Sequence, residues 1–446
     1  MRRNSKALKS VERFIESVGQ WLDSAQDKPR RPSGAQDLFP PEARGMGLFA
    51  PHLTARYRQL VEEFVEAVAR DGAAELSEEG AQELINDAID VSVFSAASGQ
   101  AAPARNRIAE AVDAIWTRVA SPPLSFRVYQ SVAGLALDTG RLEYGSVLFV
   151  PYEGDPKKEI GQALSDITEE NRQLREGIME KIDKSYEGTV LAVCPVRAFD
   201  DVAAKRMAIA QVQLTLDAIN YFCDQVLNFG LKSRVDSPRT LWPGSVETVV
   251  VIRDERGHYT METVTWGSVG PMVELPASFL SSEKGESVGA TRVSALLRKE
   301  ARTGLEKRLL ASIQWAGRAT ADPRIEEAFL LYAIALEALL AMKTSDLPIT
   351  YRLKTRVAHL VGQTRAQRKS IAAQVSALYG IRSAIVHGGR YDVPTLELTR
   401  IRFFVKEAIR IVLTEEPFKS MSNEAELEEW FESAVLGGRE SEKDAT

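Results

Sequence analysis

Apolar residues recur at helical spacing through the first 120 positions of the chain. Within residues 1–25 they return every three or four positions, at Val11, Phe14, Ile15, Val18 and Leu22, a spacing typical of an amphipathic helix. The same criterion predicts helices over residues 53–70, 77–91 and 103–119. Ser77 suits an N-cap position, and Pro103 lies close to a helix start. Residues 27–52 contain five prolines and three glycines, so we expect a linker there.

Residues 121–290 show a different pattern, in which short apolar runs are bounded by Gly, Pro and Asp. These runs predict five strands, over residues 126–137, 144–152, 189–196, 246–252 and 259–265. The last two strands flank the polar residues 253–258, which predicts a hairpin. A long helix is expected over residues 201–228. We therefore expect a mixed α/β domain that begins near Ser121-Pro122-Pro123.

From residue 291 onward the strand pattern disappears. Helical spacing predicts five helices, over residues 292–317, 323–342, 350–362, 366–387 and 395–413. Gly388-Gly389 would end the fourth of these helices. The acidic residues 421–446 are expected to be disordered, except for a short helix around residues 427–435. The predicted fold is therefore α+β and multidomain. It has a helical and linker segment (1–52), a helical region (53–120), a mixed α/β domain (121–290), an all-α bundle (291–420) and an acidic tail (421–446).

Composition restricts the class of protein. The 446 residues are 44% hydrophobic and 26% charged, as in ordinary globular proteins. Two cysteines exclude a disulfide framework, and four scattered histidines argue against a zinc enzyme, so we expect no metal and no cofactor. The first residues contain no apolar signal region, and the longest apolar stretch, 328–342, is interrupted by Glu337. We expect a cytoplasmic protein without a membrane segment.

Charge is distributed unevenly along the chain. Residues 291–420 contain 22 Lys and Arg but 12 Asp and Glu, a net charge of +10, whereas the whole chain carries −6. This asymmetry favours either a polyanionic partner or a basic face that balances the acidic remainder.

Two short motifs are candidates for chemistry. Gly285-Glu-Ser287-Val-Gly289 matches the nucleophile elbow of α/β-hydrolases, but that motif needs a buried strand before the serine, and polar residues precede it here. The second candidate is Arg382-Ser-Ala-Ile-Val-His387. The same spacing occurs at Arg253 and His258, so spacing alone is weak evidence. Arg382 and His387, however, close an otherwise apolar helix and are followed at once by two glycines.

Residues 308–390 resemble the HEPN superfamily, in its ApeA-like branch. The similar stretches are LLASIQWAGRATADPRIEEAFLLYAIALEALL, YRLKTRVAHLVG and LYGIRSAIVHGG, in that order. The resemblance implies a dimerising helical bundle in which the Arg and His motifs of two subunits meet in one cleft. Many members are metal-independent endoribonucleases, often toxins or phage-defence effectors, and others are non-catalytic. By this resemblance Arg382 and His387 would be the catalytic pair, with Ser383 where the family often has Asn, Asp or His.

The chemistry of this pair suits RNA cleavage. The ribose 2′-OH acts as an internal nucleophile, and histidine can accept or donate the proton that each step requires. Arginine presents a planar set of donors to a phosphate that gains charge. Positions i and i+5 of a helix lie about 140° apart, since a helix has 3.6 residues per turn. One chain would therefore not direct both groups at one phosphate, whereas two chains related by a two-fold axis could.

A structural interpretation of the same residues stays open. Arg382 could pair with Glu337 on the neighbouring apolar helix, His387 could bind the carbonyls at its helix end, and Tyr379 could pack in the core. Glu337 could also orient Arg382 for catalysis. Six further basic residues are candidates for an RNA backbone contact or for a solvated face: Arg352, Lys354, Arg356, Arg365, Arg368 and Lys369.

The expected function is a homodimeric endoribonuclease, a hydrolase of the toxin or antiviral-defence type. Its partner would be RNA, and residues 1–290 would respond to a trigger, either phage-derived or a nucleotide. The alternative is a non-catalytic HEPN module that dimerises or binds a nucleotide or RNA.

Overall fold

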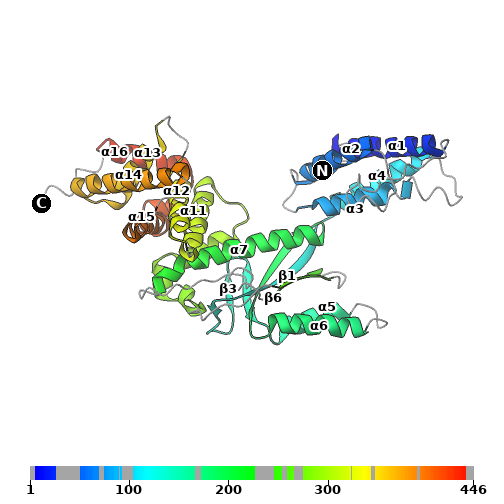
Figure 1. Cartoon of the computed structure of the whole chain (residues 1–446), viewed down its shortest axis with the longest axis horizontal. Coiled ribbons are helices and arrows are strands. Elements are labelled where there is room, and N and C mark those ends of the chain that lie inside the picture. The colour runs from blue at the N-terminus through cyan, green and yellow to red at the C-terminus, as the bar shows by residue number, and fades with distance from the viewer. Residues whose placement is uncertain are drawn as a thin grey trace.

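The computed structural model consists of three connected lobes (Figure 1). It describes residues 6–26, 51–69, 75–89, 91–92, 104–165, 172–226, 246–253, 259–265, 275–322, 324–342, 347–388 and 392–437. N-terminal helices form one end, a sheet with its covering helices lies in the middle, and the C-terminal helices form the other end. Within these residues, no helix is both long and apolar enough to cross a membrane.

The N-terminal lobe is helical and has its own apolar core. Its helices are α1 (Lys6–Gln26), α2 (Pro51–Ala69), α3 (Glu78–Ile89) and α4 (Ala104–Ala120). They enclose a cluster that includes Phe14, Phe64 and Ile85. The Ser77 hydroxyl accepts a hydrogen bond from the Gly80 amide at 2.8 Å, as expected of an N-cap. Of the predicted linker, residues 27–50 lie outside the described residues, and residues 51–52 belong to α2.

The middle lobe is built on a six-stranded antiparallel sheet with the order β3-β4-β5-β1-β6-β7. The strands are β1 (Leu124–Val132), β3 (Leu142–Tyr144), β4 (Val147–Pro151), β5 (Val190–Ala198), β6 (Val246–Arg253) and β7 (Tyr259–Thr265). The short strands β2 (Leu135–Ala136) and β8 (Leu275–Pro276) pair separately. The predicted strand 144–152 begins inside a tight hairpin instead, since Gly145 has a φ of +62° and joins β3 to β4. The turn of the predicted hairpin, residues 254–258, lies outside the described residues, but β6 and β7 pair as predicted.

Helices cover both faces of this sheet (Figure 1). Along β5, Ala192 and Cys194 belong to the core on the side of α7 (Asp201–Val226). Their neighbours Leu191 and Val193 belong to a second core, beneath α5 (Asp155–Ser165) and α6 (Arg172–Tyr186). This division follows from the alternation of side chains along a strand. The apolar pattern predicted α7 but not α5 or α6.

The C-terminal lobe is all helical in its described residues, after the short strand β8 and a 3-10 turn (Ala277–Ser281). Its helices are α9 (Glu283–Ser287), α10 (Ala290–Arg298), α11 (Gly304–Ala321), α12 (Ile325–Leu340), α13 (Ile349–Val361), α14 (Arg365–Gly388), α15 (Thr395–Thr414) and α16 (Glu424–Val435). The prediction of one helix over residues 292–317 is wrong. α10 ends at Arg298, and α11 starts anew with a capping box in which Thr303 and Glu306 satisfy each other's backbone amides.

The middle and C-terminal lobes share one apolar core, because α11 packs directly on α7. A Cβ atom at Gly317 of α11 would lie 1.8 Å from the carbonyl oxygen of Asp217 of α7, so only glycine permits this approach. Beside it, Arg318 Nε lies 2.8 Å from Asp217 Oδ2. The predicted boundary near residue 291 therefore does not separate two independent cores.

The predicted acidic tail begins inside this lobe. α16 buries Leu427 and Phe431 in the shared core. The helical lobe thus extends beyond residue 420 to at least residue 435, and residues 438–446 lie outside the described part of the chain.

Candidate functional site

The predicted catalytic residues lie on α14. Only one side of this helix is buried in the core. Its buried residues are Val375, Leu378 and Tyr379, which are three and four positions apart. The opposite face is exposed and consists of small residues that lead to the helix end, namely Ala373, Ser376, Ala377, Gly380, Ser383 and His387 itself.

Arg382 lies against the neighbouring helix α12. Its Nε atom is 3.4 Å from Glu337 Oε1, and the two side chains are 31% and 20% exposed. The ion pair that the sequence suggested is therefore present. Partial burial strengthens the attraction relative to water, because the surroundings screen the charges less. The guanidinium is thus held by a carboxylate, while the Arg382 side chain as a whole is still partly exposed.

Tyr379 completes the contact between α14 and α12. Its buried hydroxyl lies 3.3 Å from the Ala333 carbonyl oxygen, to which it donates a hydrogen bond. Burial raises the pKa of Tyr379 well above its usual range, the negative charge of Glu337 raises it further, and the positive charge of Arg382 opposes the shift. Tyr379 therefore stays neutral next to the Arg382–Glu337 pair.

His387 is exposed on the last turn of α14, and Ser383 is exposed one turn earlier. Among the described contacts His387 has neither a hydrogen bond nor an ion pair, so the alternative in which it binds the helix-end carbonyls finds no support there. Within one chain the structure does not bring Arg382 and His387 together. Arg382 faces α12, whereas His387 faces solvent at the end of the small-residue face.

Two of the six basic candidates perform a structural role. Arg352 and Arg356 donate hydrogen bonds to the carbonyl oxygens of Met342 and Leu340, at the C-terminal end of α12. Arg356 is 5% exposed and also pairs with Glu428 of α16. The prediction that Arg356 contacts an RNA backbone is therefore wrong, because protein encloses its guanidinium.

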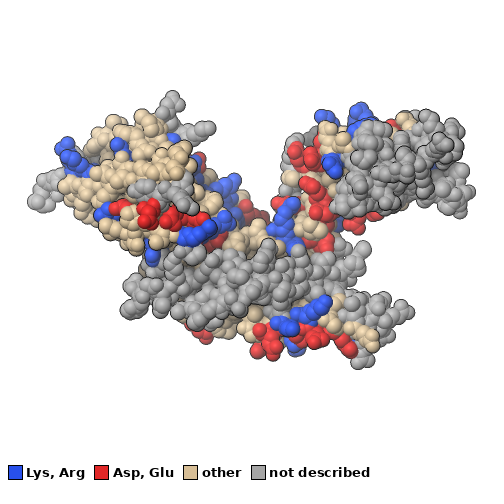
Figure 2. Space-filling model, viewed as in Figure 1, with Lys and Arg blue, Asp and Glu red and all other residues tan. Residues whose placement is uncertain are grey.

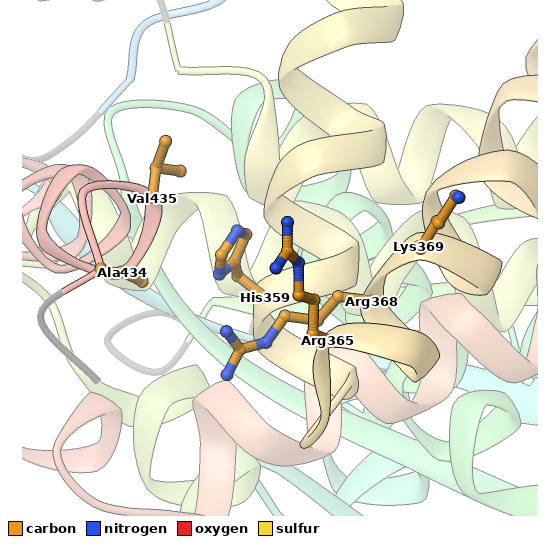
Figure 3. A pocket seen from close by; sticks show the side chains of 7 residues that line it. His359, Arg365, Arg368, Lys369, Ala434 and Val435 are labelled. Atoms are coloured by element: carbon orange, nitrogen blue, oxygen red, sulfur yellow. The ribbon is translucent and has the colours of Figure 1, made fainter. Parts of the chain in front are cut away.

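The other four candidates remain accessible. The Lys354 ammonium lies 5.2 Å from the centre of the Tyr351 ring. Arg365, Arg368 and Lys369 lie on the first turns of α14 and line a pocket with His359 of α13 (Figure 3). Lys369 and Arg382 are thirteen positions apart, which is about 20 Å along a helix. The structure thus places the basic group and the predicted catalytic pair at opposite ends of α14.

The basic side chains of the C-terminal lobe are also spread over separate places on its surface. Figure 2 shows separate basic groups on its visible face, next to acidic ones, rather than one continuous basic face. The net positive charge of residues 291–420 therefore does not by itself define a binding surface.

The other motif from the sequence does not form a nucleophile elbow. Ser287 lies at the end of the short helix α9, which follows a 3-10 turn rather than a strand. Its hydroxyl donates to the Lys284 carbonyl oxygen at 2.8 Å. In the described part of the chain, no group of three or more His, Cys, Asp or Glu side chains is arranged to hold a metal ion.

Comparisons with protein-family models, with curated proteins and with solved structures found no match to this chain. The resemblance to the HEPN superfamily therefore depends on the three stretches quoted above.

Proposed function

We propose that this protein is a homodimeric, metal-independent endoribonuclease of the HEPN type. The observation that carries the proposal is the arrangement at the C-terminal end of α14. There Arg382 pairs with Glu337 while its side chain stays 31% exposed, and His387 is exposed on the same helix. Neither side chain is fully buried within the protomer, whereas we would expect full burial of a pair with a purely structural role.

In this proposal the two residues divide the reaction between them. The ribose 2′-oxygen forms a bond to phosphorus and loses its proton, while the bond from phosphorus to the 5′-oxygen breaks and that oxygen gains a proton. One His387 accepts the first proton, and the His387 of a second copy donates the other. Arg382 donates hydrogen bonds to the phosphate oxygens, whose charge increases in the transition state. The products are a 2′,3′-cyclic phosphate and a 5′-hydroxyl.

The exposed face of α14 supports the dimer that this chemistry requires. Small side chains let another helix approach closely, and a Cβ atom added at Gly380 would meet nothing within 4 Å. A two-fold axis beside this face would bring the two His387 side chains to the same side of the interface.

The test is RNA cleavage in the presence of EDTA by wild type, Arg382→Ala and His387→Ala. We expect each substitution to lower the rate by about 10²–10⁴-fold, as for the loss of an acid–base group or of a transition-state contact. Lys307→Ala on α11 removes an exposed charge elsewhere in the lobe and serves as the control. Equal cleavage by all four proteins would contradict the proposal.

A second candidate function is a non-catalytic HEPN module that dimerises or binds RNA or a nucleotide. The Arg382–Glu337 pair favours it as well, because such a pair also stabilises the contact between two helices. Overexpression separates the two candidates. Growth arrest by wild type but not by His387→Ala supports the nuclease, whereas an inert wild type that still binds RNA supports the module.

We further propose that residues 1–290 control the nuclease in response to a phage-derived or nucleotide trigger. This proposal is supported by α7, because that helix contacts all three lobes and so connects residues 1–290 to the C-terminal helices. An unregulated ribonuclease would damage its own cell, which gives such control a purpose.

A further inference from the structure

The pocket at the N-terminal end of α14 is distinct from the region around Arg382. It has a volume of about 330 Å³. His359 of α13 and three side chains of α14 form its basic wall, and Ala434 and Val435 of α16 form the opposite wall. In Figure 3 the His359, Arg365 and Arg368 side chains turn toward a common space, with Lys369 farther along the helix. The volume lies at the lower end of the range of small-ligand pockets.

The described residues that line this pocket carry positive charge and no negative charge. Among the described residues, no carboxylate lines the pocket, and neither Arg365 nor Lys369 forms an ion pair or a side-chain hydrogen bond. Several arginines elsewhere in the lobe form ion pairs, for example Arg356 with Glu428. Three permanent positive charges within five residues repel one another, so an anion bound between them would lower the free energy of the folded protein.

Arg368 is held in place before any ligand arrives. Its Nε donates to the Gly362 carbonyl oxygen at 3.1 Å, and its Nη2 donates to the Gln363 carbonyl oxygen at 3.3 Å. A Cβ atom at Gly362 would lie 2.9 Å from Arg368 Cγ. Because glycine has no side chain, Arg368 can lie this close to the loop. A guanidinium has five N–H donors, and two are used here, so the others remain for a ligand.

The chemistry that matches this pocket is a phosphate group. Two guanidinium groups supply several hydrogen bonds, and the charge of the nearby Lys369 ammonium adds to theirs in balancing a dianion. The positive end of the α14 dipole lies beside them and adds to the attraction. The apolar wall of Ala434 and Val435 suits an uncharged part of the same ligand.

We propose that this pocket is a phosphate-binding site, which takes the phosphate of a small phosphorylated molecule or of an RNA backbone. It lies about 20 Å along α14 from Arg382 and does not depend on the proposed ribonuclease activity.

The first test uses inorganic phosphate as the probe, with sodium chloride to keep ionic strength constant. The variant Arg365→Gln/Lys369→Gln removes two exposed charges that hold no described partner and that repel each other, so its thermal unfolding midpoint should not fall below that of wild type. We expect calorimetric titration to show phosphate binding at least about tenfold weaker, the effect of losing one charge-assisted hydrogen bond. The control, Arg175→Gln/Lys181→Gln on α6, removes two charges in the middle lobe and should bind phosphate like wild type.

The second test identifies the source of the phosphate. A ten-nucleotide single-stranded RNA without terminal phosphates is titrated by fluorescence anisotropy in a His387→Ala background, so that it stays intact. If the double variant weakens RNA binding about tenfold and lowers its salt dependence, the phosphate belongs to RNA. If only inorganic phosphate binds more weakly, the site takes a small ligand.

One result would overturn the proposal, namely phosphate binding that is equal in wild type, the pocket variant and the control.

Discussion

Arg356 and Arg365 are nine positions apart, and their surroundings differ completely. Arg356 is enclosed by the end of α12, by Glu428 and by the ring of Phe431, whose centre lies 5.6 Å from the guanidinium carbon. Arg365 is exposed on the first turn of α14. A buried guanidinium is costly unless its partners are complete, so its removal leaves the carboxylate of Glu428 and a carbonyl oxygen without their donor.

Arg356→Ala should therefore lower the free energy of unfolding by about 3 kcal/mol. Lys369→Ala, which changes an exposed basic residue on the next helix, should change it by less than about 0.5 kcal/mol. Urea denaturation followed by circular dichroism measures both values. A small effect of Arg356→Ala would mean that the Arg356–Glu428 pair does not join α16 to the lobe.

The residues around Arg382 were easier to predict than those around Arg356. Glu337 interrupts an apolar helix, so its carboxylate requires a nearby partner. Arg382 lies on another helix with an apolar face, so the sequence predicts that the two helices pack and that Arg382 is that partner. The partner of Arg356 lies 72 residues later, on a helix that the sequence assigned to an acidic tail. A pattern of neighbouring residues cannot predict a contact between such distant parts of the chain. It did not predict the proposed phosphate pocket either, because the second wall of that pocket is α16.

At the level of elements, the contact of α7 with α11 joins the sheet to the C-terminal lobe. Gly317 brings the two backbones together, and Asp217 is buried beside it. Burial raises the pKa of Asp217, while Arg318 and a hydrogen bond from Gln213 oppose that shift. This carboxylate thus depends on Arg318, which reaches it only while the helices stay close.

Gly317→Ala should destabilise this junction by about 2 kcal/mol, because the added methyl group forces α11 away from α7. Gly177→Ala on α6 is the matched control. A Cβ atom there meets nothing within 4 Å, so the better helix propensity of alanine should stabilise the protein by about 0.5–1 kcal/mol. Denaturant unfolding of the two variants compares them directly, and a Gly317→Ala protein as stable as wild type would show that the helices can separate without cost.

The spacing of apolar residues predicted most helices and strands of this fold. It failed for features that the spacing does not encode, namely a helix boundary set by a cap and the pairing of strands. α12, α13, α14 and α15 lie close to their expected positions, because each buries a regular apolar face. The predicted helix 292–317 is instead two helices, since the Thr303–Glu306 capping box ends one apolar repeat and starts another. The pairing order of the strands was not predictable, because no local feature of β1 specifies β5 and β6 as its neighbours.

Across the whole molecule, α7 is the element that contacts every lobe. At its start, Asp200 accepts hydrogen bonds from the Ala203 amide at 2.8 Å and from the Ser77 amide of the N-terminal lobe at 2.9 Å. Farther along, Asp217 binds Arg318 of α11. A displacement of the N-terminal helices would thus act on the same helix that supports α11 and, through it, α12 and Glu337.

The proposed dimer provides a test at this scale, because it needs the small-residue face of α14 to be free. Ala377→Glu places a charge on that face ten positions before His387 and leaves the Arg382–Glu337 pair, on the buried side of the helix, unaltered. We expect sedimentation equilibrium to change from a dimer to a monomer, and RNA cleavage to fall about 100-fold or more, since a monomer supplies only one of the two histidines. Ala210→Glu, on an exposed position of α7, should change neither property. A monomeric Ala377→Glu protein that cleaves RNA at the wild-type rate would show that one chain holds a complete site, and a variant that stays dimeric would place the interface on another face of the lobe.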